Sequence, residues 1–319
     1  DKNDKTSPMM RHYENVKEQY KDCILFYRLG DFYELFNEDA IEISKVLDLT
    51  LTGKNCGREE RAPMCGVPYH AAEGYIAKLV QMGYKVAICE QLTDPKPGQI
   101  VERDVIKVVT PGTVTEDSML DERKNNYIMC LYKERENLAI SYSDITTGEV
   151  HTYILTFNLE ANFTDIFTTL TPSEVIGNRE AKEFYNNLPL QNIGNCPKFE
   201  EYYEYAFNLD KCKDNILKQF GDNAIQVFEL KNNLEMIAIG VLMEYLNETQ
   251  KRSIKNINKI IKHLNENNLT IDMNTRRNLE LVESIRERKK YGSLLWLLDK
   301  TKTSMGARRF RENFAHPSK

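Results

Sequence analysis

The sequence lacks any long apolar stretch. No run of about eighteen apolar residues, the length that a membrane-spanning helix needs, occurs in the 319 residues. The N-terminus DKNDKTSPMM also lacks the apolar core of a signal peptide. We therefore predict a cytoplasmic protein with no membrane partner. Only ten prolines are present and no segment is of low complexity, so we expect ordered structure nearly throughout.

The short motifs of metal and nucleotide sites are also missing. The seven cysteines form no C-x-x-C pair, and none lies near a histidine at the spacing of zinc ligands. No G-x-x-x-x-G-K-[ST] loop is present, so we expect no ATP site in this chain. The sequence thus predicts buried, reduced thiols, no metal site, no bound cofactor and no catalytic residue.

Charge is distributed unevenly along the chain. The formal net charge of -5 by itself disfavours a nucleic acid partner. Counted by region, it is -4 for residues 1–116, -11 for 117–250 and +10 for 251–319. A basic last region is able to face phosphates, although helices rich in Lys and Arg are more often simply solvated. The acidic middle region disfavours DNA as its direct partner.

The length predicts two or three domains. Up to about residue 115 the pattern is mixed α/β, with helices predicted at 11–20, 37–49 and 70–83 and strands at 23–29, 85–92 and 103–112. Residues 50–70 contain three glycines and two prolines, which predicts a long loop or an open hairpin.

A second α/β unit follows a predicted linker at 116–126. In it LAISYSD and EVHTYIL flank the turn ITTG, and we expect Gly148 to take the positive φ that such a hairpin needs. From about residue 209 the pattern becomes helical, with clear examples at 237–250 and 274–290. The last amphipathic helix has no later helix to cover it, which predicts an N-terminal fragment of a longer protein.

Several motifs point to one family. In chain order they are SPMMRHY, ILFYRLGDFYELF, PMCGVPYHAAEGYIAKLV, VERDVIKVVTPGT, DITTGE and LLDKTKTSMGARRFR. Together they resemble the N-terminal part of the MutS family of DNA mismatch repair proteins. The resemblance implies an α/β multi-domain chain: a mixed α/β mismatch-binding domain at 1–115, an RNase H-like α/β connector domain at 127–235 and the start of an all-α core domain at 236–319.

The same resemblance implies a function and its partners. The expected function is recognition of base mismatches and small unpaired loops in duplex DNA, which initiates DNA mismatch repair. The expected partners are mismatched double-stranded DNA, a second copy of the full-length chain, and MutL through the connector and core region. ATP and Mg are expected in an ATPase domain beyond residue 319.

The family's Phe-x-Glu motif corresponds to Phe32, Tyr33 and Glu34. Side chains alternate along an extended segment, so we expect Phe32 and Glu34 on one face and Tyr33 and Leu35 inside the domain. The resemblance implies that Phe32 inserts from the minor groove. An apolar wedge unstacks a base step for about a few kcal/mol, and less where a mismatch has already weakened the stacking.

Glu34 is the less expected residue, because phosphates repel a carboxylate. It fits where it accepts a hydrogen bond from a base edge that mispairing has freed, or where it is protonated and donates one. Against an intact pair the same charge opposes binding. We therefore predict that Glu34 contacts the mispaired base and discriminates against intact duplex.

Phosphate contacts require cations near the wedge. Lys54 and Arg58 lie in the 50–70 segment, and Arg103 begins the last predicted strand of the first unit. We predict all three as phosphate contacts, with solvated surface as the alternative for each. Met64 is a candidate apolar contact beside the opened groove, and ordinary packing is its alternative.

Two other functions remain open. An RNase H-like fold supports a metal-dependent nuclease when clustered carboxylates hold two Mg²⁺ ions. Asp144 and Glu149 are candidates, but no convincing further carboxylates accompany them, which favours a turn function for DITTGE. The second alternative is a family paralogue that binds recombination junctions or serves as an interaction scaffold, although a scaffold has no use for an exposed wedge.

Overall fold

The chain forms two compact units. A computed structural model describes residues 6–93, 101–114, 125–190, 196–251, 254–263, 275, 278–286 and 289–315. One unit is Asp1–Val114 with Asn247–Ser253, and the other is Thr115–Leu246 with Ile254–Lys319. Each unit contains a six-stranded mixed sheet. The predicted mixed α/β character is confirmed at this level.

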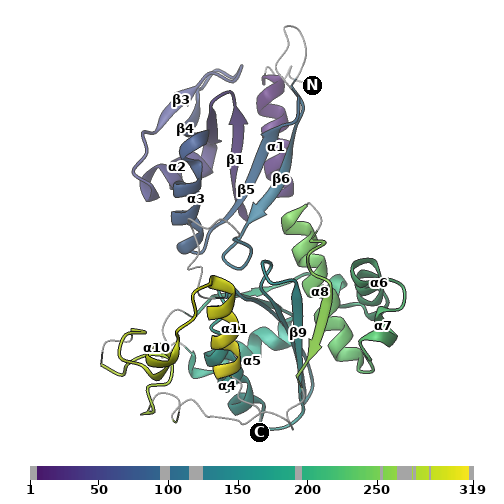
Figure 1. The fold of residues 1–319 in the computed structure, drawn as a ribbon. Coiled ribbons are helices and arrows are strands. Elements are labelled where there is room, and N and C mark those ends of the chain that lie inside the picture. The colour runs from purple at the N-terminus through teal and green to yellow at the C-terminus, as the bar shows by residue number, and fades with distance from the viewer. Residues whose placement is uncertain are drawn as a thin grey trace. The chain divides into compact units, whose positions relative to one another are not determined.

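The sheet of the first unit has the order β3-β4-β2-β1-β5-β6 (Figure 1). β1 and β5 run parallel, and the other neighbouring strands run antiparallel. The strands are β1 (Cys23–Leu29), β2 (Phe32–Phe36), β3 (Thr52–Lys54), β4 (Ala62–Pro68), β5 (Lys85–Gln91) and β6 (Arg103–Val109). The helices are α1 (Pro8–Gln19), α2 (Asn37–Val46), the 3-10 turn η1 (Tyr69–Ala71) and α3 (Ala72–Gln81).

Helices cover both faces of this sheet, which explains the unbroken apolar run of β1. Met10 and Tyr13 of α1 pack on one face, beside Leu25 and Tyr27. α2 and α3 pack on the strands from the other face. A strand that is buried on both faces needs no polar alternation. α1 starts where the Ser7 side chain accepts a hydrogen bond from the Met10 N–H, as N-cap residues do.

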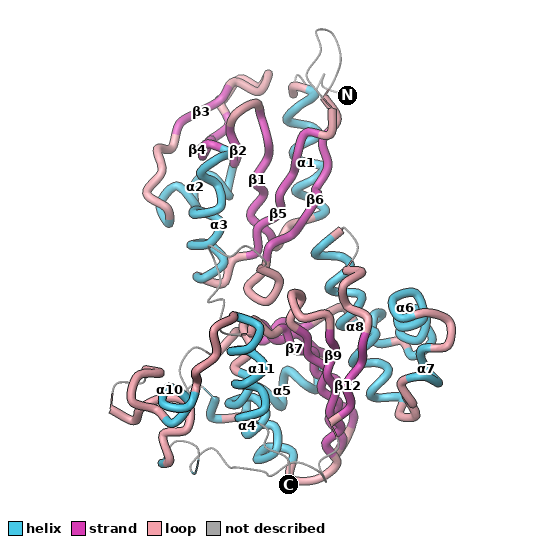
Figure 2. The backbone as a smooth tube through the Cα atoms, viewed as in Figure 1, coloured by secondary structure: helices cyan, strands magenta, loops and turns pink. Residues whose placement is uncertain are grey.

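The sheet of the second unit has the order β11-β10-β7-β8-β9-β12 (Figure 2). β10 runs parallel to β7 and β11, β12 runs parallel to β9, and β7, β8 and β9 form antiparallel neighbours. The strands are β7 (Ile128–Glu134), β8 (Asn137–Ser143), β9 (Glu149–Leu155), β10 (Glu174–Gly177), β11 (Phe199–Glu201) and β12 (Lys259–Lys262). The helices are α4 (Leu159–Leu170), α5 (Arg179–Asn187), η4 (Glu204–Phe207), α6 (Leu209–Phe220), α7 (Ala224–Val227), α8 (Asn233–Gln250), α10 (Leu294–Leu298) and α11 (Ser304–Ala315).

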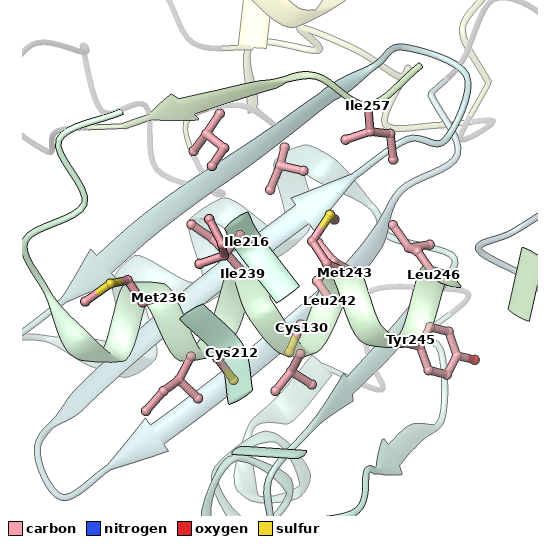
Figure 3. Packing of buried hydrophobic residues seen from close by; sticks show 14 of the residues in the cluster. Cys130, Cys212, Ile216, Met236, Ile239, Leu242, Met243, Tyr245, Leu246 and Ile257 are labelled. Carbon is pink, nitrogen blue, oxygen red and sulfur yellow. The ribbon is translucent and has the colours of Figure 1, made fainter. Parts of the chain in front are cut away.

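α8 forms the centre of one core of this unit. Its buried side chains include Ile239, Leu242 and Met243, and they lie in one cluster with Cys130 of β7 (Figure 3). At Gly240 a Cβ would lie 2.5 Å from the Cα of Cys212, so only glycine lets α6 come this close to α8. The predicted helical segment from residue 209 therefore contributes to the core beside the second sheet.

The predicted hairpin around ITTG is confirmed. β8 pairs with β9 in antiparallel register from Leu138 opposite Leu155 to Ser143 opposite Val150. Gly148 has a φ of +78°, in the region that glycine adopts without strain.

Two predictions for the C-terminal part are corrected. The helix over 274–290 is wrong for residues 279–286, which form turns and bends. Leu279 and Ile285 are about half exposed, and an amphipathic helix draws most of its stability from burying such residues. The all-α assignment of 236–319 is wrong for Lys259–Lys262, because β12 adds to the sheet beside β9. KIIK is too short to show a strand period.

The predicted domain limits stay predictions. The border between residues 235 and 236 lies inside α8, which runs from Asn233 to Gln250. Most of the linker predicted at 116–126 lies outside the described residues. The RNase H-like description of the connector also stays a prediction.

Candidate nucleic-acid interface

A tight hairpin carries the Phe-x-Glu motif. β1 and β2 pair antiparallel, and Leu29 opposite Phe32 leaves only Gly30 and Asp31 in the turn. Gly30 has a φ of +58°, which is the glycine-first pattern of a two-residue type II′ hairpin. The chain therefore reverses direction at Gly30 and Asp31, and Phe32 becomes the first residue of β2.

Side chains alternate along β2 as predicted. Phe32 is 47% exposed, whereas Tyr33 and Leu35 are buried. Glu34 shares the face of Phe32 and is half-buried, and Phe36 on the same face is fully buried. The ring centroids of Phe36 and Tyr13 of α1 are 4.9 Å apart. This face is thus covered by α1 at Phe36 and open at Phe32.

β4 forms the other side of this surface. Pro68 lies opposite Phe32, Gly66 opposite Glu34 and Met64 opposite Phe36. The hairpin alternative for residues 50–70 is therefore confirmed, because β3 and β4 pair antiparallel. Met64 is partly buried and packs against the core cluster of this unit. This position gives Met64 a packing role, and its predicted contact with DNA stays a prediction.

Glu34 and Lys54 form an ion pair. Lys54 Nζ lies 2.5 Å from Glu34 Oε2, and the two side chains are 34% and 15% exposed. Lys54 Nζ also lies 5.8 Å from the centroid of the Phe36 ring. The cation that we predicted as a phosphate contact is therefore held beside the carboxylate of the motif.

The two predicted arginines also have protein partners. Arg58 Nη2 lies 2.9 Å from Glu14 Oε1, and Arg58 Nε donates to Thr6 Oγ1. Arg103 Nε donates to the carbonyl oxygen of Arg28 at 3.0 Å. The Arg103 guanidinium lies 5.5 Å from the Tyr27 ring centroid, and Tyr27 lies opposite Glu34 in the β-ladder. Arg103 is thus brought toward the motif, whereas Arg58 is fixed to α1.

Sequence reasoning missed Arg28, which organises the other face of the hairpin. Its guanidinium lies 3.8 Å from the ring centroid of the exposed Tyr69 and 5.6 Å from that of Tyr33. The Tyr33 hydroxyl donates to Glu90, and the Tyr69 N–H donates to the Asp31 carbonyl at 2.9 Å. Burial, followed by the bond to Glu90, raises the pKa of Tyr33. This network supports the face of the hairpin opposite Glu34, and the sequence around Arg28 did not indicate it.

The carboxylates of the nuclease alternative have structural partners. Asp144 is buried and accepts hydrogen bonds from the N–H groups of Asn126 and Thr146. Glu149 pairs with Lys259 at 3.2 Å. Within the described ranges no group of three or more His, Cys, Asp or Glu is placed to hold a metal ion.

Of the helices that the structure describes, none has both the length and the apolar character for crossing a bilayer.

Three family models match the chain in order. The model of MutS domain I matches residues 7–118, that of MutS domain II matches 126–258, and that of MutS domain III matches 274–319. The Phe-x-Glu hairpin lies within the first match. The carboxylates of the nuclease alternative lie within the second.

Curated relatives are similar over nearly the whole chain. A protein of Lachnoclostridium phytofermentans named DNA mismatch repair protein MutS is 46% identical over 318 residues, covering 98% of this chain and 33% of the relative. Proteins of the same name from Ruminiclostridium cellulolyticum and Clostridium botulinum are each 48% identical, over 317 and 314 residues. These matches cover 98% of this chain and 36% and 33% of the relatives. The chain thus spans about a third of the length of these relatives.

Proposed function

Because the chain belongs to the MutS family, as its matches to MutS domains I, II and III show, we propose that it recognises base mismatches and small unpaired loops in duplex DNA. The observation that carries this proposal is the half-exposed Phe32 at the start of β2, on one face with Glu34. Packing within the unit does not require an aromatic ring at this exposed position. Such a ring suits insertion between base steps.

The proposed mechanism begins with the rigidity of the hairpin. Phe32 follows a two-residue turn, and the nearby Tyr33 and Leu35 are buried. The backbone that carries the Phe32 ring is therefore held in place by the turn and by packing. Insertion from the minor groove unstacks one base step at about a few kcal/mol. A mismatched or bulged step resists unstacking less than a paired one, so the preference arises from deformability and not from a fixed sequence.

Glu34 supplies the second element of the proposed mechanism. Its carboxylate faces the same surface as Phe32 and accepts a hydrogen bond from Lys54. A mispaired base presents edge groups that a paired base does not, and a carboxylate can bond to those groups. The Lys54 charge reduces the repulsion between Glu34 and nearby phosphates. Recognition then combines a steric wedge with a polar contact to the base.

The partners and cofactors of the longer protein are part of the same proposal. We expect a second copy of the chain, MutL as a partner of the connector and core, and ATP with Mg in a region outside these 319 residues. A cytoplasmic location is expected as well. Arg58 and Arg103 are proposed phosphate contacts that would exchange or share their present partners on binding.

The test is low-salt fluorescence anisotropy of the 319-residue chain. It compares a duplex that contains one unpaired thymine with the matched duplex, for wild type, Phe32→Ala and Glu34→Ala. Met82→Ala is the control, because Met82 is an exposed apolar residue of the same unit at the end of α3. All titrations are run at one stated salt concentration, since phosphate contacts make affinity depend on salt.

We expect wild type and Met82→Ala to prefer the heteroduplex and Phe32→Ala to lose that preference. Loss of one stacked aromatic contact is worth about 1–3 kcal/mol, or roughly 5- to 150-fold in affinity. Equal affinity for both duplexes, unchanged in Phe32→Ala, would contradict the wedge and favour the alternative of a paralogue that binds recombination junctions. Absence of DNA binding altogether would favour the alternative of an interaction scaffold.

A further inference from the structure

Gly66 lies where the two side chains of the proposed DNA contact converge. It is the β4 partner of Glu34 and is itself partly exposed. A Cβ built on Gly66 would lie 3.7 Å from Glu34 Cγ and 3.9 Å from Phe32 Cδ1. Both side chains therefore extend along the bare backbone of this glycine.

The backbone at Gly66 does not explain the glycine. Its φ lies outside the positive range, so other residues can adopt its conformation. A glycine inside a strand also weakens it by about 0.5–1 kcal/mol relative to alanine. The added Cβ would come within 3.3 Å of the Tyr33 carbonyl oxygen, a tight contact that a small shift of the strand relieves. Glycine within a strand often marks a place where a ligand approaches the backbone closely.

We propose that Gly66 is a specificity-determining residue for mismatch recognition. Its bare backbone forms the floor of a shallow slot between the Phe32 ring and the Glu34 carboxylate, and this slot receives the edge of the unstacked nucleotide. The inference rests on the proposed function, because it assigns the space between the two residues of the proposed contact. A side chain larger than a methyl group at this position separates Phe32 from Glu34 and fills the space that the nucleotide needs.

The substituents predict a graded effect. An alanine methyl group would make ordinary contacts with both side chains, so Gly66→Ala shifts them little. The branched side chain of Gly66→Val carries two more carbons than that methyl group and must displace the ring or the carboxylate. Gly74→Ala is the matched control, because Gly74 lies in α3 of the same unit and its Cβ would have no atom within 4 Å.

The experiment measures the affinity ratio between the unpaired-thymine duplex and the matched duplex for these variants and for Phe32→Ala. A 2-aminopurine beside the unpaired thymine reports unstacking, and thermal unfolding reports stability. We expect Gly66→Val to lower the ratio about tenfold, as loss of one specific base contact does, and Gly66→Ala to lie between it and wild type. Matched-duplex affinity and unfolding temperature should not fall below those of wild type, and 2-aminopurine fluorescence should fail to rise.

Three outcomes overturn the inference. If Gly66→Val keeps the wild-type ratio while Phe32→Ala loses it, the slot is wrong and the proposed function stands. If Gly66→Val weakens binding to both duplexes equally and lowers the unfolding temperature, Gly66 is only a structural residue. If wild type itself shows no preference, the proposed function and the inference fail together.

Discussion

Lys54 of β3 and Glu34 of β2 are joined by an ion pair across the intervening strand β4, with Lys54 Nζ 2.5 Å from Glu34 Oε2. The carboxylate proposed to contact DNA therefore already has a cationic partner on the protein. This pairing suggests a second role for Lys54 beside the phosphate contact that we predicted, which stays a prediction. A lysine that contacts a phosphate acts alone, whereas a lysine that positions and neutralises Glu34 acts through that residue.

We predict that Lys54→Gln weakens DNA binding mainly through Glu34. Removal of the lysine leaves a half-buried carboxylate without its cation and exposes the DNA phosphates to its charge. In a double-mutant cycle with Glu34→Gln, affinities for the unpaired-thymine duplex should be non-additive by about 0.5–3 kcal/mol. Stability should fall by about 1–3 kcal/mol, because the mostly buried Glu34 carboxylate loses its charged donor. Additive losses in affinity would instead identify Lys54 as an independent phosphate contact.

Arg58 and Arg103 should respond differently to replacement by alanine. Arg58 is exposed and held by Glu14, so Arg58→Ala should weaken binding equally for matched and mismatched duplexes. The slope of log K against log salt should fall by about 1, the value for one lost phosphate contact. The measurement is anisotropy at four salt concentrations, with unfolding in urea as the check on stability.

Arg103→Ala should reduce the salt slope as well and, unlike Arg58→Ala, should also lower stability. Arg103 bonds to the Arg28 carbonyl and lies over the ring of Tyr27, so its loss removes one hydrogen bond and a cation–π contact inside the unit. Together these are worth about 1–2 kcal/mol of the free energy of unfolding. A variant as stable as wild type but with a reduced salt slope would show that Arg103 is primarily a phosphate contact.

Alkaline pH should destabilise the first unit through its buried thiols. Burial, followed by the charge of Asp39, raises the pKa of Cys65 to about 11. Burial, followed by the charge of Asp104, raises the pKa of Cys89 to about 12. An unfolded thiol ionises near pH 8.5, so above that pH the unfolded chain releases protons that the folded chain keeps. The contribution of these two thiols to the free energy of unfolding is thus fully present below about pH 8.5 and declines as pH rises toward 11 and 12.

The check is urea unfolding under reducing conditions at pH 8, 9 and 10. Each thiol contributes a fall of up to about 1.4 kcal/mol per pH unit within that range. Cys65→Ala lacks one of these thiols and should show a shallower decline than wild type. Equal declines in both proteins would show that ionisation of Cys65 does not lower the free energy of unfolding.

The exposure pattern of β2 was predictable because it is local. The period of two along an extended strand places Phe32 outward and Tyr33 inward, whatever the neighbouring strand is. The positive φ of Gly148 followed from the turn sequence in the same way. The partners of these residues were not predictable. The positions of Gly66 and Lys54 beside Glu34 depend on which strands pair. The glycines and prolines of residues 50–70 did not indicate where the strand β4 lies.

Helices whose apolar faces need distant partners were also hard to predict. Residues 274–290 have a helical period, yet Leu279–Arg286 form turns, because the period alone does not supply a surface to bury. α8 shows the opposite case. Its residues 236–243 are all apolar, and Ile239 and Leu242 are buried in the core beside the second sheet, whereas the pattern suggested a separate helical domain.

Asp144→Asn should separate the turn function of DITTGE from the nuclease alternative. The buried Asp144 carboxylate accepts hydrogen bonds from the Asn126 N–H, the Thr146 N–H and the Thr146 hydroxyl. The amide is neutral and has one acceptor oxygen in place of two, so all three donors lose a charged partner and at least one loses its acceptor atom. We expect the free energy of unfolding to fall by about 1–3 kcal/mol. Asp222→Asn, at an exposed position of the same unit, is the control.

The measurement combines urea unfolding with a cleavage assay, each with and without Mg²⁺. A carboxylate that serves only the turn gives the same loss of stability in both conditions, and Mg²⁺ stabilises neither wild type nor variant, since a ligand that binds the folded state would raise its stability. We also expect wild type to leave duplex and single-stranded DNA uncut. Cleavage that requires Mg²⁺ and disappears in Asp144→Asn, but not in Asp222→Asn, would overturn the turn function and establish a nuclease on the second unit.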